Sequence, residues 1–361
     1  MILDTTLREG LQRVGVYLDL PARRKVASAL LEAGILELEL GVVGRDGLLK
    51  PLIDLVAASG SGARSWAWAR MRLEDVEQAA RMGVRNLALC APASPQHQEL
   101  RLGLSLEAAC ARVHEVVVRA VALGMTVSVG LEDASRTLPE SLLATAEVAR
   151  EAGAVRVRMA DTVGVLSAAE VSVLVARLCA TGLEVGFHGH DDFGMATANA
   201  LAALAAGAVA VDASLLGSGE RAGIAATEVL GTWLAIRRGA PFSPALLAAA
   251  ARDFSDLSGQ AIAPHAPVVG ERLFACETGL HVAAIARDPS LYEPFDPSLV
   301  GSRRELCVGG KSGLAAIRQA LLEDDPGIEV TSDLVSRVRR AAERLGRPLQ
   351  PDELSRLVRA A

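Results

Sequence analysis

The sequence predicts an α/β protein, a TIM (β/α)8 barrel, followed by a C-terminal extension of mixed loops and helices. Short β-branched or apolar runs alternate with longer segments of helical periodicity, which is the pattern of repeated βα units around a parallel sheet. Eight such runs fit into about 240 residues, the usual size of a TIM barrel. No GxGxxG follows any run, so the doubly wound open sheet is the weaker alternative.

The expected strands lie, in order, at residues 1–6, 35–40, 65–69, 84–90, 125–131, 155–159, 183–188 and 208–213. Helical segments between them include 20–33, 73–82, 105–123, 139–152, 167–181 and 194–206. Six of the expected helices are followed by a glycine just before the next strand. Glycine is favoured there because the residue that ends a helix often adopts the left-handed conformation. These glycines are Gly34, Gly83, Gly124, Gly153, Gly182 and Gly207.

The βα repeat ends near residue 239. Segments that carry Pro and Gly fill residues 240–313, and a charged helical tail follows at 314–361. We therefore expect a catalytic barrel at 1–239 and an extension at 240–361.

The composition fits a large enzyme and excludes several other classes of protein. Of the 361 residues, 51% are hydrophobic and 3% aromatic, so Ala, Val and Leu must build the core. A net charge of -6 with scattered arginines argues against a nucleic-acid partner. Neither a membrane span nor a secretory signal pattern is present. Five cysteines without a CxxC pair are typical of reduced thiols, so a cytoplasmic location is expected.

Polar residues follow most of the expected strands. In a TIM barrel the active site lies at the carboxyl ends of the strands, so these residues are expected to converge on one mouth. The candidates are Arg8, Glu9, Glu39, Glu132, Arg136, Thr162, His188 and His190.

His188 and His190 form an HxH pair at the end of the seventh expected strand. Residues i and i+2 of an extended chain share a face, so both imidazoles project to the same side. Imidazole is the commonest ligand of borderline divalent metals, and Glu9 would supply a carboxylate. A structural histidine pair is the alternative, but the position at the barrel end favours a metal site. The choice among Mg, Mn and Zn stays open.

Arg8, beside Glu9, fits two interpretations. It is either half of an exposed ion pair or a cation that stabilises negative charge developing on a metal-bound oxygen. Glu39 on the neighbouring strand is placed to hold its guanidinium through a bidentate pair.

Seven motifs together resemble the DRE-TIM metallolyase superfamily, and they cover nearly the whole chain. The motifs are DTTLREG (4–10), LELELG (36–41), GLEDASR (130–136), ADTVG (160–164), HGHDDFGMATANALAALAAGA (188–208), GSGERAG (217–223), and ETGLHV with YEPFDP (277–297). Within the superfamily the chain resembles the branch that condenses acetyl-CoA with a 2-oxo acid. It is most similar to the homocitrate synthases, in particular the short form that serves nitrogenase cofactor synthesis.

The resemblance implies roles for the residues at the mouth. Glu9, His188 and His190 match the ligands of a divalent metal. Arg8 matches the arginine that polarises the keto group, with Glu39 as its anchoring acid.

Gln12, Arg136 and Thr162 match substrate-binding positions, and Arg136 matches the partner of a substrate carboxylate. His281 and Tyr292 match an acid/base and orienting pair that the other subunit supplies in this branch, which implies a homodimer. His281 is the preferred base and Glu132 the alternative.

The resemblance implies a Claisen condensation of acetyl-CoA with 2-oxoglutarate, followed by thioester hydrolysis to homocitrate and CoA. The lack of the regulatory domain typical of isopropylmalate and citramalate synthases favours this substrate. Those synthases, a lyase of the same superfamily and a non-catalytic metal-binding barrel remain the alternatives. Two positions depart from the family pattern: Ile224 replaces an asparagine, and Leu138 stands where a polar side chain is expected.

Overall fold

The computed structural model describes residues 1–45, 47–321 and 329–359. The chain divides into two compact units, Met1–Ala261 and Ile262–Ala361. Each unit is described by itself below.

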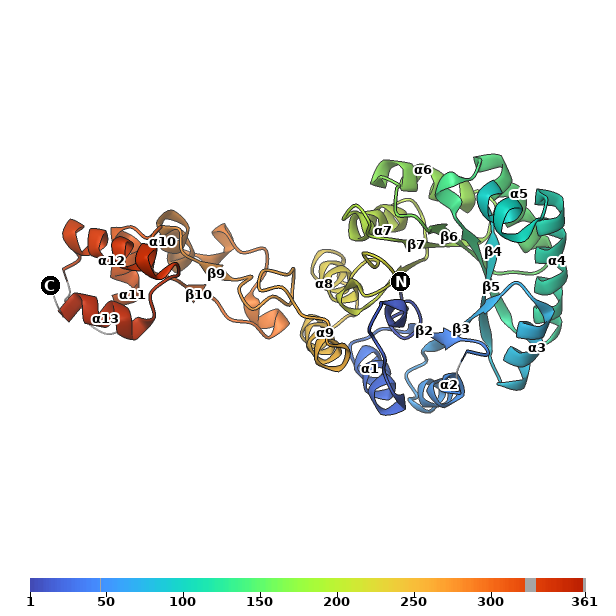
Figure 1. Ribbon diagram of the computed structural model, residues 1–361, viewed down its shortest axis with the longest axis horizontal. Coiled ribbons are helices and arrows are strands. Elements are labelled where there is room, and N and C mark those ends of the chain that lie inside the picture. Colours follow the sequence, from blue (N-terminus) through green and yellow to red (C-terminus); the bar gives the residue numbers. More distant parts are fainter. Residues whose placement is uncertain (46, 322–328, 360–361) are drawn as a thin grey trace. The chain divides into compact units, whose positions relative to one another are not determined.

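The first unit is a closed barrel of eight parallel strands, which confirms the predicted fold. The strands are hydrogen-bonded in chain order, and β8 closes the barrel on β1. Helices surround the strands (Figure 1). The strands are β1 (Ile2–Asp4), β2 (Glu37–Val42), β3 (Arg64–Arg70), β4 (Asn86–Pro92), β5 (Thr126–Glu132), β6 (Arg156–Asp161), β7 (Glu184–Gly189) and β8 (Ala210–Ala213).

Each strand lies within two residues of its expected bounds. β1 ends at Asp4 rather than at residue 6 because the backbone turns there. The N–H groups of Arg8, Glu9 and Gly10 all donate to the carbonyl oxygen of Thr5. This tight turn, rather than a longer strand, presents Arg8 and Glu9 at the carboxyl end of the barrel.

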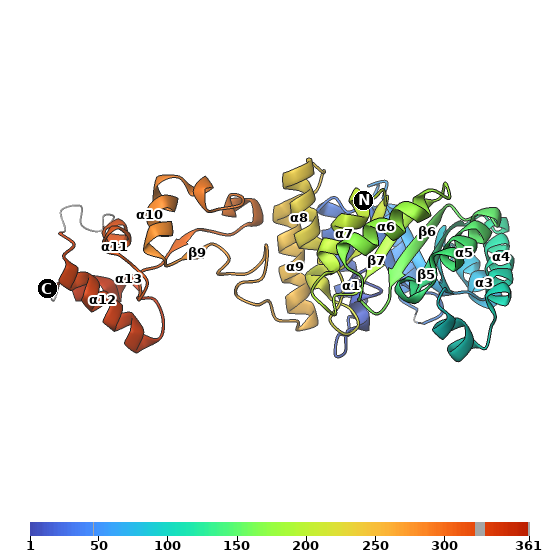
Figure 2. The same cartoon turned by 90° about the horizontal axis from the view of Figure 1, so that it is seen from above.

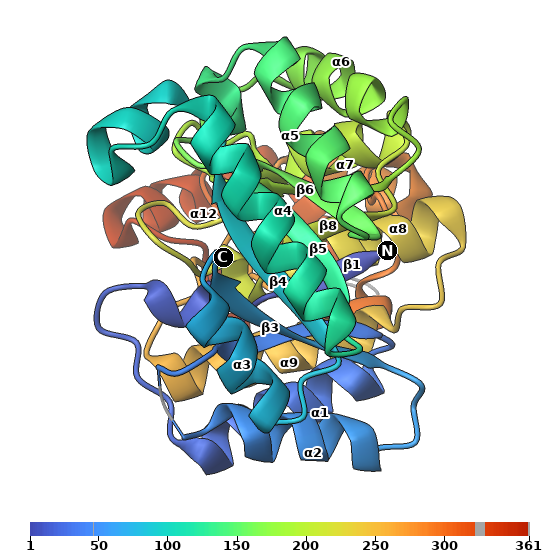
Figure 3. The ribbon, with the colours of Figure 1, turned by 90° about the vertical axis from the view of Figure 1, so that its right-hand side faces the viewer.

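The outer layer is formed by helices that follow the strands (Figure 3). All six glycines expected at left-handed helix ends have positive φ. The helices are α1 (Leu20–Glu32), α2 (Leu49–Ala58), α3 (Leu73–Arg81), α4 (Leu106–Ala122), α5 (Pro139–Glu151), α6 (Ala168–Cys179), α7 (Ala196–Ala205) and α8 (Thr227–Arg238).

A ninth helix, α9 (Pro244–Ser258), packs against α1 and α8 (Figure 2). Its residues Leu247 and Phe254 are fully buried. The compact barrel unit therefore extends to Ala261, beyond the boundary expected after residue 239.

The second unit contains a parallel pair of two-residue strands, β9 (Ala275–Cys276) and β10 (Glu305–Leu306), and four helices. Its hydrophobic core includes Ile317, Leu334 and Val338. The helices are α10 (Gly279–Arg287), α11 (Leu314–Leu321), α12 (Ser332–Leu345) and α13 (Pro351–Arg359).

All five cysteines are free. Within the residues that the structure describes, no helix is long and apolar enough to cross a membrane.

Candidate active site

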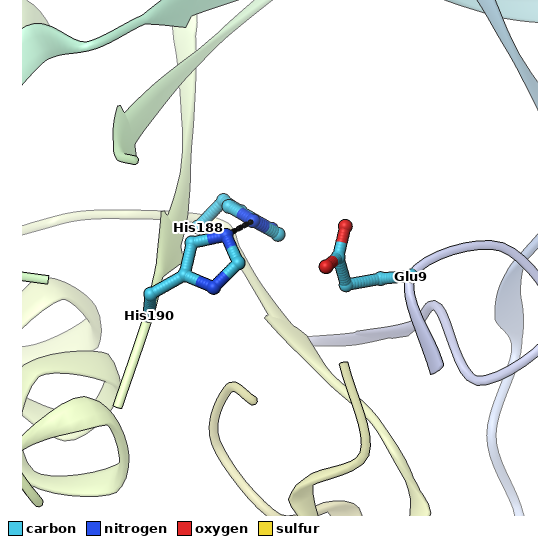
Figure 4. Close-up of side chains that lie close together, drawn as sticks. All are labelled: Glu9, His188 and His190. Atoms are coloured by element: carbon cyan, nitrogen blue, oxygen red, sulfur yellow. Dashed lines mark hydrogen bonds between the residues drawn. The ribbon is translucent and has the colours of Figure 1, made fainter. Parts of the chain in front are cut away.

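Glu9, His188 and His190 meet at the carboxyl end of the barrel. One donor atom of each residue lies within 4.8 Å of the others, and all three residues are buried. Figure 4 shows the two imidazoles facing the Glu9 carboxylate. The Nε2 atoms of His188 and His190 are 3.3 Å apart.

This donor set fits a divalent cation. Two imidazole nitrogens that converge with a carboxylate are the ligand types that borderline divalent metals take. His190 Nδ1 is buried and has no hydrogen-bond partner among the described residues, so His190 does not draw its orientation from a protein partner at that nitrogen.

Local backbone geometry holds Glu9 against the histidines. Glu9 Oε1 accepts a hydrogen bond from the backbone N–H of Glu220 at 3.2 Å. Gly219 lies so close that a Cβ there would be 3.3 Å from Glu9 Oε1. The amide of Gln12, with its NH2 group facing Glu9, donates to Glu9 Oε2 at 3.0 Å. Gln12, which the resemblance places among the substrate-binding positions, therefore contacts the Glu9 carboxylate in this structure.

Arg8 is buried and paired, not exposed. Its Nε donates to Glu39 Oε2 at 2.5 Å, and its Nη1 contacts Glu9 Oε2. The expected Arg8–Glu39 pair is thus present, although Glu39 receives only one of the Arg8 nitrogens.

Two further residues extend this arrangement. Arg158 Nη1 donates to Glu39 Oε1 at 3.0 Å and to Asp212 Oδ2 at 2.9 Å. Asp212 Oδ2 lies 2.9 Å from His188 Nδ1. We call the resulting chain of contacts the buried charge network; its members are Glu9, Arg8, Glu39, Arg158, Asp212 and His188.

Arg158 and Asp212 are not among the site residues predicted from the sequence. Both lie inside expected strands, in the runs VRVRM and AVAVDA, where a charged residue interrupts apolar neighbours. Such an interruption is the signal that would have indicated them, because a charge inside a barrel strand needs a buried partner.

The network lowers the pKa of two of its carboxyl groups, those of Glu9 and Glu39. Burial raises the pKa of Glu39, but the guanidiniums of Arg158 and Arg8 outweigh burial and lower that pKa to about 2. Burial likewise opposes ionisation of Glu9, and Arg8 with the two histidines brings its pKa below the usual value. Burial and the neighbouring His188 lower the pKa of His190 to about 4. At neutral pH, His190 is therefore an uncharged imidazole that can donate a lone pair.

Glu132 lies at the end of β5, and both of its carboxylate oxygens accept hydrogen bonds. Arg101 donates to both of its oxygens, at 3.0 and 2.5 Å, from the π-helical turn Gln96–Arg101. Burial raises the pKa of Glu132, but the hydrogen bonds and charge of Arg101 outweigh it and lower that pKa.

Arg136 is also paired within the barrel mouth. Its Nε donates to Asp133 Oδ1 at 2.9 Å, and its side chain remains 41% exposed. Thr162 Oγ1 accepts from the Asp133 backbone N–H at 2.9 Å. Asp133 thus contacts both predicted substrate residues, and part of the Arg136 side chain stays exposed.

The two departures from the family pattern lie in different surroundings. Ile224 is 2% exposed and forms an antiparallel bridge with His190. Leu138 is 67% exposed at the start of α5.

His281 and Tyr292 lie together in the second unit. His281 belongs to α10, and Tyr292 follows a short 3-10 turn. Their rings stack with centroids 4.1 Å apart and planes tilted by 34°.

Large apolar side chains are exposed on the loops that follow β1, β4, β5 and β7. We call this set the apolar rim. Its members are Val14, Tyr17, Leu100, Leu138 and Phe193, and each is at least two-thirds exposed. Exposed apolar side chains grouped at one end of a protein typically mark a surface that another molecule covers.

Comparison with known proteins gives matches along most of the chain. A family model described as HMGL-like matches residues 1–257, and one described as homocitrate synthase post-HMGL domain-like matches residues 268–347. A homocitrate synthase of Frankia alni is 38% identical over 88% of this chain and 92% of that protein. A 2-isopropylmalate synthase of Caldanaerobacter subterraneus is 36% identical over 98% of this chain and 93% of that protein.

Among solved structures, the HMG-CoA lyase of Bacillus subtilis superposes with a TM-score of 0.64 at 21% identity, covering 74% of this chain and 96% of that chain. This likeness concerns the fold of the barrel.

Proposed function

The chain belongs to the HMGL-like family, and from this premise we propose that it is an acyltransferase that condenses acetyl-CoA with a 2-oxo acid. We propose 2-oxoglutarate as that acid and homocitrate with CoA as the products. The observation that carries the proposal is the cluster of Glu9, His188 and His190 beside the buried pair of Arg8 and Glu39.

The site residues divide the work of the reaction. Glu9, His188 and His190 would hold a divalent ion, which supplies Lewis-acid polarisation of the keto carbonyl. Arg8, fixed by Glu39, stabilises the negative charge that gathers on the keto oxygen as the new C–C bond forms. Because Arg8 is already held before the substrate arrives, little reorganisation is needed at that moment.

A general base must take a proton from the acetyl methyl group. Both oxygens of Glu132 accept hydrogen bonds from Arg101, which supports assigning the base to His281. Tyr292 stacks on His281 and restricts the orientation of its ring. Hydrolysis of the thioester then releases CoA.

We further propose that His281 and Tyr292 reach the barrel mouth from a second copy of the chain, in a homodimer. The apolar rim supports this, because it offers a surface at the mouth that needs a cover. In this arrangement the extension serves both the active site and the dimer.

The distal carboxylate of 2-oxoglutarate needs a cation, and we assign it to the exposed face of Arg136. Thr162 fixes the Asp133 loop that carries Arg136. Leu138 next to this position favours one alternative, a branched apolar 2-oxo acid such as the substrate of an isopropylmalate synthase.

The test is release of free CoA from acetyl-CoA, followed with a thiol reagent. The expected result is release that depends on 2-oxoglutarate and that a chelator abolishes. Release with 2-oxoisovalerate or pyruvate but not with 2-oxoglutarate would move the assignment to a sister synthase.

Two variants test the site in the same assay. Glu9→Gln and His188→Ala should each abolish release, because each removes one ligand of the ion. His114→Ala is the matched control, since His114 is an exposed histidine on α4. Unchanged turnover in both site variants would refute the proposal.

A further inference from the structure

Arg158 lies at the centre of the buried charge network without touching any of the three proposed metal ligands directly. It comes from β6, and its side chain is 7% exposed. One nitrogen, Nη1, donates both to Glu39, the partner of Arg8, and to Asp212, the partner of His188.

We propose that Arg158 is a positioning residue that fixes Arg8 and His188 relative to each other. It does so by holding Glu39 and Asp212 from a single atom. The proposal rests on the metal-binding part of the proposed function and not on the identity of the 2-oxo acid.

The barrel makes room for this side chain. In the strand register Arg158 pairs with Gly130 on β5 and with Gly186 on β7. A Cβ at Gly186 would lie 3.5 Å from Arg158 Cγ, and one at Gly130 would lie 4.0 Å from Arg158 Nε. Because neither neighbour has a side chain, Arg158 can cross the barrel interior to β2 and β8.

The charges explain why the position matters. Burial opposes the charge on Arg158, but Asp212 and Glu39 outweigh it and raise the pKa of its guanidinium. Without this guanidinium two buried carboxylates lose a partner, which is costly in a barrel interior. Asp212 would then move to find a new partner, and the imidazole of His188 would lose its fixed orientation. Loss of groups that orient a metal ligand typically weakens metal binding by about 10- to 100-fold.

Arg156 provides a matched control on the same strand and face. It lies two residues earlier and is 2% exposed. Its partners are Glu37, at 2.8 Å, and Glu184, at 2.9 Å. Loss of Arg156 therefore breaks a buried ion pair of similar kind without breaking the contacts to Glu39 and Asp212.

The experiment is calorimetric titration of the metal-stripped full chain with Mn²⁺. Arg158→Met is expected to weaken Mn²⁺ binding by about 10- to 100-fold, and Arg158→Lys to recover most of the loss, because an ammonium can also bridge two carboxylates. Arg156→Met should bind Mn²⁺ within about twofold of the wild type, although both Met variants lower the melting temperature.

A second pair of variants covers the case in which Arg158→Met does not fold. Gly186→Val places a branched side chain against Arg158 and should weaken Mn²⁺ binding, whereas Gly186→Ala adds only an ordinary contact and should not.

Three results would overturn the positioning role. They are an Arg158→Met variant that binds Mn²⁺ as well as or better than the wild type, an Arg156→Met variant that loses as much affinity, and equal binding by the two Gly186 variants. A wild-type chain that binds no Mn²⁺ would instead refute the proposed metal site itself, and the positioning role with it.

Discussion

Replacing Glu228 by glutamine is expected to stabilise the barrel at alkaline pH and to leave its stability unchanged near pH 4, below the ordinary pKa of the carboxyl. Glu228 is 2% exposed, and its Oε2 accepts the backbone N–H of Leu216 at 3.0 Å. Burial raises the pKa of this carboxyl to about 7 from its ordinary value of 4.5. Leu216 has a φ of 56°, so this hydrogen bond holds a residue in a conformation that non-glycine residues rarely adopt.

The sign follows from proton binding. Between pH 4.5 and about 7 the folded chain keeps a proton on Glu228 that the unfolded chain has released. Stability therefore falls as the pH rises through this window, and the loss is complete above the folded pKa. At about 1.4 kcal/mol for each pKa unit, the cost of ionising this group in the folded state reaches about 3.5 kcal/mol. Glutamine keeps the carbonyl acceptor and has no such cost.

The assay is thermal unfolding of the full chain at several pH values between about 4 and 8.5. At roughly 2 °C for each kcal/mol, the glutamine variant should melt about 7 °C above the wild type at the alkaline end and at the same temperature near pH 4. The exposed Glu151 provides the control, because Glu151→Gln should leave the melting temperature unchanged at every pH. A Glu228→Gln variant whose melting temperature differs from the wild type by the same amount at every pH would refute the reasoning.

Three further predictions concern the site and the barrel. Gly219→Ala places a Cβ 3.3 Å from the Glu9 carboxylate, and about tenfold weaker Mn²⁺ binding is expected by calorimetry; unchanged affinity would show that the carboxylate moves aside freely. Arg156→Met breaks a buried ion pair and should lower the free energy of unfolding in urea by about 3–5 kcal/mol; a loss below about 1 kcal/mol would contradict the pairing. A chain of residues 1–261 should unfold cooperatively, whereas residues 1–239 lack the buried face of α9 and should aggregate; equal melting of the two would place α9 outside the barrel.

The residues of the proposed metal site could be predicted from the sequence because they lie next to apolar runs, which are easily recognised as strands. Glu9, His188 and His190 come directly after or at the end of apolar runs, and a barrel brings such positions to one mouth. The same argument located Glu39, Glu132 and Arg136. It did not give their partners, because partner choice depends on how neighbouring loops close over the mouth.

Arg136 illustrates this limit. As an isolated arginine after a strand it looked free to bind a substrate, yet it pairs with Asp133, three residues before it. Asp133 has a φ of 64°, a backbone conformation that could not be predicted from the sequence. Asp133 is close to Arg136 in the sequence, but the turn that brings the two side chains together is visible only in the structure.

The eighth βα unit ends at Arg238, next to the expected boundary at residue 239, but the compact unit continues to Ala261. Pro241 and the residues around it interrupt the βα repeat, so the chain after 239 looked like the start of a different region. In the structure Ser243 caps α9 by accepting a hydrogen bond from the Leu246 N–H. The helix then returns its apolar face to α1 and α8. The sequence shows where the βα repeat is interrupted, but it does not show that the next helix packs back against the barrel.

The buried charge network also has a consequence for how the protein folds. Its members come from the first loop of the barrel and from β2, β6, β7 and β8, and β8 must pair with β1 before they can meet. Pairing between the two ends of a long sequence is a late and slow event in folding. Binding of Mn²⁺ at the proposed site is therefore expected to require completed closure of the barrel. In a refolding experiment the helical signal should return before the ability to bind the ion, and the delay between them measures the lifetime of the open barrel.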